Sequence, residues 1–384
     1  MKQIVKDSLA YGLAGTLAFL ATMTMSAQNR RDVPQTFENK DMYDIVRVAP
    51  TKGKKVKNVI LMISDGTGTS HFASALVANG GKLNITENAM AAGLVRTTCA
   101  NKLITDSGAA ASAMATGEKA DYHTISVNSD GSLRNTIMDD AKKKNLATGV
   151  VATVQLTDAT PAAFCAHHTD RNNAWELAPH FVESNVDFIF GGGSKYFANR
   201  PDGRDLFVEM KAKGYLATTN ADEALSANSA KVFCLTDSLE MPPAEKRDNL
   251  LSKASLKAVE TLSKQKNGFF LMIEGSQSDD YAHGNDLYNT MMETLDFDKA
   301  TGEMLKWAEA NGETLVLVVA DHETGGLSLL DGDEEKGTVT AKFTNGGHTG
   351  VLVSSFAYGP GSDAFGGVYD NNEIFHKIKR LLGL

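Results

Sequence analysis

One serine lies in an unusual setting, at the start of a stretch with almost no bulky side chains. Residues 104–117 read ITDSGAAASAMATG, in which Ser107 follows an aspartate and precedes a run of small residues. The run favours a helix, because alanine is the strongest helix former and Gly117 stands where a helix would end. Ser107 would then be the cap or the first residue, beside unpaired backbone N–H groups. Two interpretations stay open here: an ordinary capping serine, or a nucleophile facing a phosphate-like anion, which helix N-termini attract.

Three apolar runs of strand length end in a carboxylate. NVILMIS is followed by Asp65, GFFLMI by Glu274, and TLVLVVA by Asp321 and His322. One Asp-Gly pair after a strand is usually a turn, since both residues suit turns. Ligands of open α/β sheets bind outside the carboxyl ends of the strands. Three carboxylate endings on three core strands therefore predict a shared site.

Two further patterns add histidines to these carboxylates. DDYAHG places Asp279 and His283 four residues apart, which puts them on one face of a helical turn. GGHTG places His348 in a glycine-rich loop just before the last apolar run. Each pattern alone is weak, because such residues are more often surface groups. Together with Asp321 and His322 they form two histidine–carboxylate groups, which suit zinc, while the other oxygen ligands suit magnesium.

A fourth run, GVVATV, leads into two more polar segments. QLTDATPAAF carries Asp158 and Thr160, and CAHHTDRNN follows with Arg171. Taken alone, Arg171 would be read as a surface charge. Near metal ions and a serine, its guanidinium would instead clamp a phosphate-like anion with two hydrogen bonds.

The elements that must position these residues are apolar runs with helical patterns between them. The runs cover residues 58–64, 149–154, 186–190, 268–273, 314–320 and 351–357. Their hydrophobicity is continuous, which is typical of strands buried on both faces, as in a parallel sheet. Helical patterns follow over 250–266 and over 293–311, the latter ending at Gly312. We expect a doubly wound α/β fold, a three-layer sandwich around a large, mostly parallel central sheet.

Two segments fit this alternation less well. Residues 195–249 are expected to hold peripheral elements. Residues 331–345 read DGDEEKGTVTAKFTN and predict a charged surface excursion with a short hairpin.

The composition excludes some classes of protein. With 384 residues, 42% of them hydrophobic and 22% charged, the chain has the make-up of a globular α/β protein. A net charge of -9 and the lack of a basic stripe argue against a specific nucleic-acid partner. The three cysteines, Cys99, Cys165 and Cys234, have no CxxC spacing and are expected to be small buried residues, with one disulfide pair left open.

Taken together, the motifs resemble those of the metal-dependent alkaline phosphatases of bacterial type. The resemblance runs from about residue 56 to the C-terminus. It rests on seven motifs in order: NVILMISDG, TDSGAAASAMATG, TDATPAAF, HHTDR, IEGSQSDDYAHG, VVADHETGG and GGHTG. Each motif is moderate evidence, but their order and spacing are highly specific. The resemblance implies hydrolysis of small phosphate monoesters and a homodimer. The family often has a large insert near the dimer interface between the positions of His322 and His348; this chain is short there, so we expect a reduced crown insert.

The resemblance also implies a role for each matching residue. Ser107 would be the nucleophile and form a covalent phosphoserine. One zinc ion would be held by Asp65, Asp321 and His322. A second zinc ion would be held by Asp279, His283 and His348.

The remaining matches concern a magnesium ion and the phosphate. Asp65 would bridge to one magnesium ion bound by Thr160 and Glu274, with Asp158 acting directly or through water. Arg171 would hold two phosphate oxygens, and Asp106 would orient Arg171.

One residue departs from the family pattern. Several members carry Lys, His or Trp directly after the zinc-ligand aspartate, whereas this chain has Asp280. A lysine there would help to neutralise phosphate, so we expect weaker inhibition by the product.

The start of the chain resembles an export signal. Lys2 and Lys6 precede a mostly apolar stretch at 9–23, and small residues follow. The stretch is short and rich in Gly and Thr, which favours a cleaved signal over a membrane span. We expect a signal peptide at 1–27, an arm or linker at 28–50 and one alkaline-phosphatase-like catalytic domain at 51–384. The mature chain would be periplasmic or secreted, with no membrane span.

Two alternatives to a phosphomonoesterase stay open. A phosphodiesterase of the same superfamily can use the same two-metal site, although Arg171 suits the extra free oxygen of a monoester. An exported phosphate-binding protein without turnover would have lost the nucleophile or a metal ligand, yet every expected position is filled. A sulfatase is disfavoured, because TDSGAAA lacks the proline and arginine of the C/S-x-P-x-R context.

Overall fold

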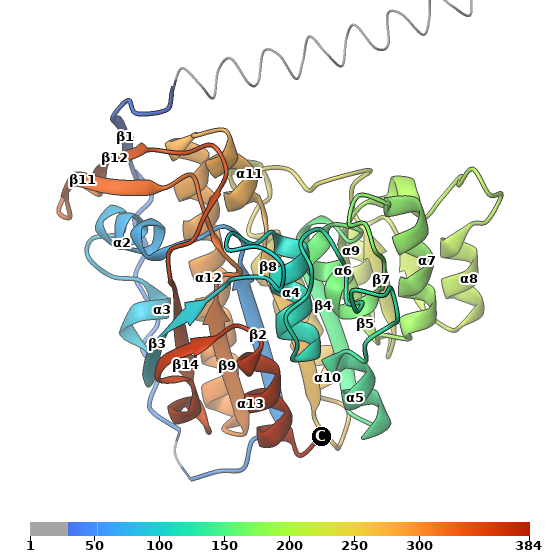
Figure 1. Ribbon diagram of the computed structural model, residues 1–384. Helices are drawn as coiled ribbons and strands as arrows, with labels where there is room; N and C mark the ends of the chain where they lie inside the picture. The colour runs from blue at the N-terminus through green and yellow to red at the C-terminus, as the bar shows by residue number, and fades with distance from the viewer. Residues whose placement is uncertain (1–29, 52) are drawn as a thin grey trace, which may run out of the picture.

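A ten-stranded sheet runs through the computed structural model, which describes residues 30–51 and 53–384 (Figure 1). The predicted signal peptide at 1–27 lies outside the described residues. In spatial order the strands are β15 (Gly367–Asp370), β3 (Ala91–Arg96), β14 (Val353–Tyr358), β9 (Thr314–Val319), β2 (Asn58–Ser64), β8 (Phe269–Gly275), β4 (Ala147–Gln155), β5 (Phe188–Gly192), β7 (Val232–Leu235) and β6 (Leu216–Thr218). All neighbours are parallel except β14, which is antiparallel to both β3 and β9.

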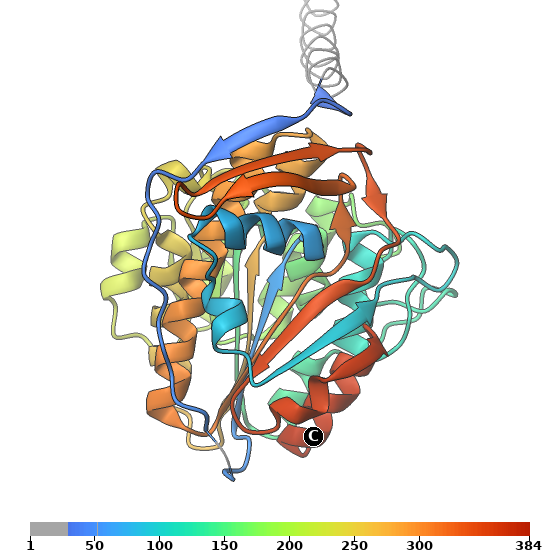
Figure 2. The same cartoon turned by 90° about the vertical axis from the view of Figure 1, so that its left-hand side faces the viewer.

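Helices cover both faces of this sheet, which makes three layers (Figure 2). One face carries α4 (Ser107–Thr116), α5 (Ile137–Lys143), α6 (Ala159–Cys165), α7 (Ala174–Ser184), α8 (Leu206–Ala212) and α13 (Glu373–Leu382). The other carries α2 (Thr69–Ala78), α3 (Asn84–Glu87), α9 (Ala221–Ser226), α10 (Leu250–Leu262) and α12 (Leu287–Asn311). Short 3₁₀ turns are η1 (Ser194–Tyr196), η2 (Ala244–Lys246) and η3 (Ser362–Phe365). The expected doubly wound three-layer fold is confirmed.

The central strand β2 shows why its sequence is apolar throughout. Val59, Leu61 and Ile63 belong to the core under one helical layer, while Ile60 and Met62 belong to the core under the other. Alternate side chains of a strand point to opposite faces, so a strand covered on both sides needs no polar positions.

Helix α4 is the helix predicted from the alanine-rich run. Asp106 is its N-cap, Ser107 its first residue and Gly117 its C-cap, with φ +82°. Every residue of α4 is buried, and the helix packs on α6. The small side chains of α4 let its axis lie close to that of α6, because the distance between packed helices depends on the side chains at their contact.

Two small sheets lie beside the large one. The first has the order β1 (Gln35–Glu38), β12 (Thr338–Phe343) and β11 (Leu327–Asp333), so the predicted hairpin within 331–345 is present as β11–β12. The second joins β10 (Glu323–Thr324) to β13 (His348–Thr349). The prediction of a plain loop around His348 was wrong, because the main chain there pairs with β10.

Two other expectations about strands were incomplete. The run 351–357 starts its strand only at Val353, and Val351 and Leu352 are exposed. The segment 195–249, expected to be peripheral, supplies β6 and β7 at one edge of the large sheet. All three cysteines are buried and free. Among the described residues, no helix combines the length and apolar character needed to cross a bilayer.

Candidate active site

The carboxyl ends of three neighbouring strands meet at one place. Strand β2 lies between its parallel neighbours β8 and β9. As a result, Nε2 of His322 lies 3.2 Å from Oδ2 of Asp321 and 3.6 Å from Oδ1 of Asp65. We call Asp65, Asp321 and His322 the buried group, since all three are buried. Glu274, near the end of β8, is buried as well.

A glycine lets the second set of residues come close to the first. Gly66 follows Asp65 with φ +68°, in the left-handed region. A Cβ at this position would lie 2.8 Å from Oδ1 of Asp279. Only glycine therefore allows the turn after β2 to touch α11 (Gln277–His283).

The second set comes from α11 and β13, and we call Asp279, His283 and His348 the half-buried group. Nε2 of His283 lies 3.4 Å from Oδ2 of Asp279 and 3.1 Å from Nε2 of His348. Asp279 and His283 share one turn of α11, as the sequence spacing predicts. The ring of His348 stacks on that of His322 at 3.6 Å between centroids, so the two groups are adjacent.

The hydrogen bonds of these histidines indicate what belongs between them. Nδ1 of His283 lies 2.9 Å from the carbonyl oxygen of Gly346, and Nδ1 of His348 lies 2.8 Å from that of Thr105. Carbonyls only accept, so both Nδ1 atoms donate, and in the neutral rings both Nε2 lone pairs face Asp279 and each other. Such an arrangement needs a cation, and metal-binding histidines are usually oriented by carbonyls in this way.

Oxygen atoms without hydrogen-bond partners indicate that the buried part of the site also needs a cation. Oδ1 of Asp65, Oδ2 of Asp321, Oγ1 of Thr160 and both carboxylate oxygens of Glu274 are buried without a hydrogen-bond partner among the described residues. A buried carboxylate oxygen without a partner is costly unless it binds a metal. Carboxylate and hydroxyl oxygens are ligands that a hard cation such as Mg²⁺ prefers. The residues present therefore fit the metal ions that the motifs imply.

Burial, with the charges of neighbouring carboxylates, disfavours ionised carboxylates at the site. Burial, followed by the charges of Asp321, Asp279 and Glu274, raises the pKa of Asp65 well above its ordinary value. Burial is also the main cause that raises the pKa of Asp321 and of Glu274. Burial and then His348 lower the pKa of His322, which keeps its ring neutral.

Ser107 lies at the entrance of α4, next to these groups. Its Oγ is 3.1 Å from Nε2 of His322. The neighbouring Asp106 accepts hydrogen bonds from the backbone N–H groups of Gly108 at 3.2 Å, Ala109 at 3.3 Å and His123 at 3.0 Å. Asp106, not Ser107, therefore caps the helix, and the serine hydroxyl is left free to face the site. This arrangement removes the ordinary capping explanation for Ser107.

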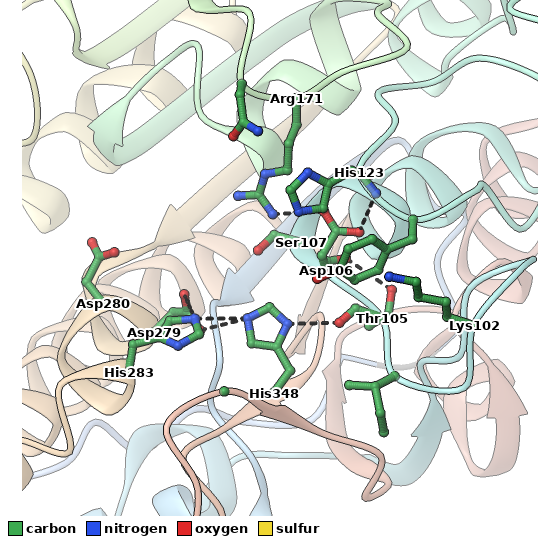
Figure 3. Close-up of a pocket in the computed structure, with 14 residues that line it drawn as sticks. Lys102, Thr105, Asp106, Ser107, His123, Arg171, Asp279, Asp280, His283 and His348 are labelled. Carbon is green, nitrogen blue, oxygen red and sulfur yellow. Dashed lines mark hydrogen bonds and ion pairs between the residues drawn. The ribbon is translucent and has the colours of Figure 1, made fainter. Parts of the chain in front are cut away.

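Arg171 is held in place from two sides. Its Nη1 donates to Oδ2 of Asp106 at 2.9 Å, and its Nη2 donates to Oδ1 of Asp158 at 3.2 Å. Burial lowers the pKa of Arg171, but the charges of Asp158 and Asp106 outweigh it and raise the pKa above its ordinary value. Figure 3 shows Ser107 between Arg171 on one side and the half-buried group on the other. The contact of Asp106 with Arg171 is the one expected from the motifs, whereas that of Asp158 was not foreseen.

The pocket around Ser107 has a volume of about 510 Å³, enough for more than a phosphate group. Its wall includes residues that the motifs do not single out: Lys102, Ile104, Tyr122, His123 and Asn172. Asp280 lies on the opposite rim (Figure 3). Thr324 also escaped notice, although its hydroxyl contacts both Asp279 and His322. The sequence signal that could have found it is its place in the motif VVADHETGG, two residues after His322.

Comparisons with known proteins agree with this geometry. The family model for alkaline phosphatases matches residues 56–342. Alkaline phosphatase 3 of Bacillus subtilis (strain 168) is 30% identical over 470 residues, which cover 100% of this chain and 98% of that protein. The alkaline phosphatase of Escherichia coli (strain K12) is 30% identical over 409 residues, covering 86% of this chain and 87% of its own.

Solved structures of alkaline phosphatases are similar to this chain as well. The alkaline phosphatase from the Antarctic bacterium TAB5 is 38% identical, with a TM-score of 0.80 over 86% of this chain and 98% of that chain. A mutant of the TAB5 enzyme with magnesium bound in its M3 site superposes with the same identity and TM-score, over 99% of its chain. Since the matches span most of both partners, the chain belongs to the alkaline phosphatase family and is an enzyme that hydrolyses phosphate monoesters.

Proposed function

We propose that hydrolysis proceeds through a covalent phosphoserine at Ser107, with two zinc ions and one magnesium ion bound. The observation that carries this proposal is the position of the Ser107 hydroxyl. The hydroxyl belongs to the first residue of α4 and its oxygen lies 3.1 Å from Nε2 of His322. Ser107 lines the same pocket as Arg171 and the half-buried group. The N-terminus of a helix also favours a phosphate group electrostatically.

Each ion has a set of residues that fits it. The buried group would hold one zinc ion and the half-buried group the second. Magnesium would be held by Thr160 and Glu274 with the bridging Asp65, and Asp158 would support it; the unpaired oxygens favour this assignment. The TAB5 mutant with magnesium in its M3 site gives a precedent among related structures. When bound, two metal ions of this kind neutralise phosphate charge and stabilise the attacking and leaving oxygens of an in-line displacement.

Arg171 would bind the phosphate of the substrate. A guanidinium has five N–H donors, and the pairs with Asp106 and Asp158 occupy two of them. The others remain for two phosphate oxygens. Because both carboxylates hold the guanidinium, it is oriented before the substrate arrives, which lowers the entropy cost of binding.

The covalent steps follow from the position of Ser107. Its oxygen forms a bond to phosphorus while the bond to the leaving oxygen breaks, and the alcohol product takes a proton. Water then adds to phosphorus, the bond to the serine oxygen breaks, and the serine hydroxyl regains its proton as phosphate leaves. Phosphoryl transfer of this kind depends mainly on positioning and charge neutralisation.

The test is hydrolysis of p-nitrophenyl phosphate by residues 28–384 loaded with zinc and magnesium, from about pH 7 to 10, around the pKa of zinc-bound water. The bis-ester and the sulfate are run beside it. We expect fast monoester turnover that a chelator abolishes. Acid quenching during turnover should leave phosphate on the peptide that contains Ser107.

Two variants sharpen the test. Ser107→Ala should abolish both turnover and the labelled peptide. Ser112→Ala removes a second buried serine from the same helix and should keep both. Faster turnover of the bis-ester would favour a phosphodiesterase, and bound phosphate without any turnover would favour a binding protein.

We further propose the chain organisation that the sequence suggests. Residues 1–27 would be removed on export, and residues 28–50 would form an arm before the catalytic domain at 51–384. The N-terminal sequence of the exported protein tests the cleavage site. Light scattering of the same sample tests the expected homodimer.

A further inference from the structure

We propose that Thr324 is a positioning residue whose hydroxyl couples the buried group to the half-buried group. This inference rests on the proposed metal sites, since it concerns the residues that would hold them. Thr324 is not a metal ligand in that proposal. It acts through Asp279 and His322, one residue from each group.

The backbone fixes Thr324 firmly. The residue is fully buried in β10, where it pairs with His348 of β13. Its backbone N–H donates to the carbonyl oxygen of Gly66 at 3.0 Å, next to Asp65. The main chain of Thr324 therefore connects the strand end of β2 to the strand that carries His348.

The hydroxyl of Thr324 has two partners but one proton. It donates to Oδ1 of Asp279, and it lies 3.2 Å from Nδ1 of His322. A carboxylate that binds a metal has no proton to give, so the hydroxyl proton must point to Asp279. The hydroxyl oxygen then accepts a hydrogen bond from the Nδ1–H of His322.

This order of donors fixes the tautomer of His322. With its proton on Nδ1, the ring directs the Nε2 lone pair toward the carboxylates of Asp321 and Asp65 and toward Ser107. In His283 and His348 backbone carbonyls impose the same tautomer. For His322 the side chain of Thr324 does this, and the same hydroxyl also fixes the carboxylate of Asp279. Water cannot take its place, because the position is closed to solvent.

The experiment measures Zn²⁺ affinity by competition with a chromophoric chelator, without substrate. Thr324→Val keeps the shape and removes the hydroxyl, whereas Thr324→Ser keeps the hydroxyl. Thr301→Val is the matched control, since Thr301 is also buried and its hydroxyl donates to the carbonyl oxygen of Phe297 at 3.0 Å in α12. Loss of a residue that orients metal ligands typically costs 10–100-fold in affinity. We expect a weakening of about that size in Thr324→Val, at both zinc sites, and less than about threefold in the other two variants.

Zinc affinity in Thr324→Val equal to that of the parent chain would overturn the proposal. An equal loss in Thr301→Val would also overturn it, because the effect would then be general to buried threonines. Melting of the metal-free proteins checks that the variants fold, and Thr324→Ala carries the same comparison if Thr324→Val does not. A parent chain that binds zinc but does not hydrolyse phosphate esters would refute the phosphoserine function alone, and the affinity of Thr324→Val would still decide the role of Thr324.

Discussion

The two ligand groups have similar residues in different surroundings. The side chains of Asp321 and His322 are 0% exposed, and they stand at the end of a central strand of the sheet. The side chain of His283 is 40% exposed, and it stands on the short helix α11 near the surface. One group is built into the core of the fold, and the other is brought to it by peripheral elements.

The surroundings change how each group balances its charge. Burial lowers the pKa of His283, but the hydrogen bond and charge of Asp279 outweigh it and raise that pKa to about 9. The half-buried group can therefore hold a proton on His283 when no metal is bound. In the buried group the pKa of His322 is lowered, so its ring stays neutral and carboxylate oxygens remain unpaired. The comparison indicates that, without a metal ion, the half-buried group balances its charge with a proton on His283, whereas the raised pKa values of Asp65 and Asp321 let the buried group do so with protons on its carboxyl groups.

The largest expected difference comes from removing one histidine from each group. His322→Ala should lower kcat/KM for p-nitrophenyl phosphate by well over about 100-fold, since loss of a mere orienting residue already costs 10–100-fold. His283→Ala should lose less, and added zinc should restore part of the activity, because the site is open to solvent. Zinc content is measured alongside. His180→Ala, on α7 outside both groups, is the control. Equal losses that zinc does not restore would remove the distinction.

The two carboxylates that hold Arg171 repeat the contrast between buried and exposed positions. The side chain of Asp106 is 2% exposed and that of Asp158 is 34% exposed. Asp106→Asn should cost about 10–100-fold in kcat/KM, because misplacing a binding group by about 1 Å can cost 10²-fold. Asp158→Asn should cost less than about fivefold, as expected for an ion pair that is partly open to solvent. Both are assayed at saturating magnesium, and the reverse order would contradict this account.

Metal release should also distinguish the groups. When a chelator is added to the zinc-loaded enzyme, we expect two phases, with the faster at least about tenfold quicker, since exposed sites open locally at low free-energy cost. The faster phase belongs to the half-buried group. It should accelerate further in His283→Gln, while the slower phase stays unchanged. A single phase would mean that the two groups release metal as one unit.

The smallest expected effect concerns Asp280 on the exposed rim. Burial, followed by the charges of Asp279 and Asp158, raises the pKa of Asp280 to about 8. Replacing it by lysine therefore changes the local charge by two units above about pH 8, where solvent-like screening corresponds to about three- to tenfold tighter phosphate inhibition. Asp280→Asn should give an intermediate value. The inhibition constant of inorganic phosphate is the readout. An unchanged constant in Asp280→Lys would mean that the rim charge does not reach the phosphate.

The sequence predicts the central strands well because they are apolar on both faces. The run 58–64 coincides with β2, and the run 314–320 is within one residue of β9. Strand β3 was missed because five of its six residues are exposed or half-buried, and β6 because it has only three residues. The direction of β14 could not be predicted, since continuous hydrophobicity reports burial and not the partner's orientation.

For the candidate site, too, the sequence predicts some features and not others. The residue types and their order predict Ser107, Arg171 and the metal ligands as site residues. In the structure Ser107 and Arg171 line one pocket with Asp279, His283 and His348, and Asp65, Asp321 and His322 form a second group beside it. The contacts that hold them are not in the motif. The pair of Asp158 with Arg171 depends on the angle of a turn after α6, and the contact of Thr324 with Asp279 depends on how β10 packs against α11. Such contacts follow from tertiary packing, which a single sequence does not specify.

The place of β2 between β8 and β9 also bears on how the chain folds. Residues 58–64 are among the first strands to be synthesised, yet they pair with residues 269–275 and 314–319. Contacts between residues so distant in sequence form slowly. Strand β2 can therefore pair on both edges only after most of the chain has been synthesised. Until then it presents two unpaired apolar edges, which are prone to aggregate. A chain that stops between β8 and β9 would lack Asp321 and His322 and leave one apolar edge of β2 unpaired, so premature termination there should yield insoluble protein and not a weakened enzyme.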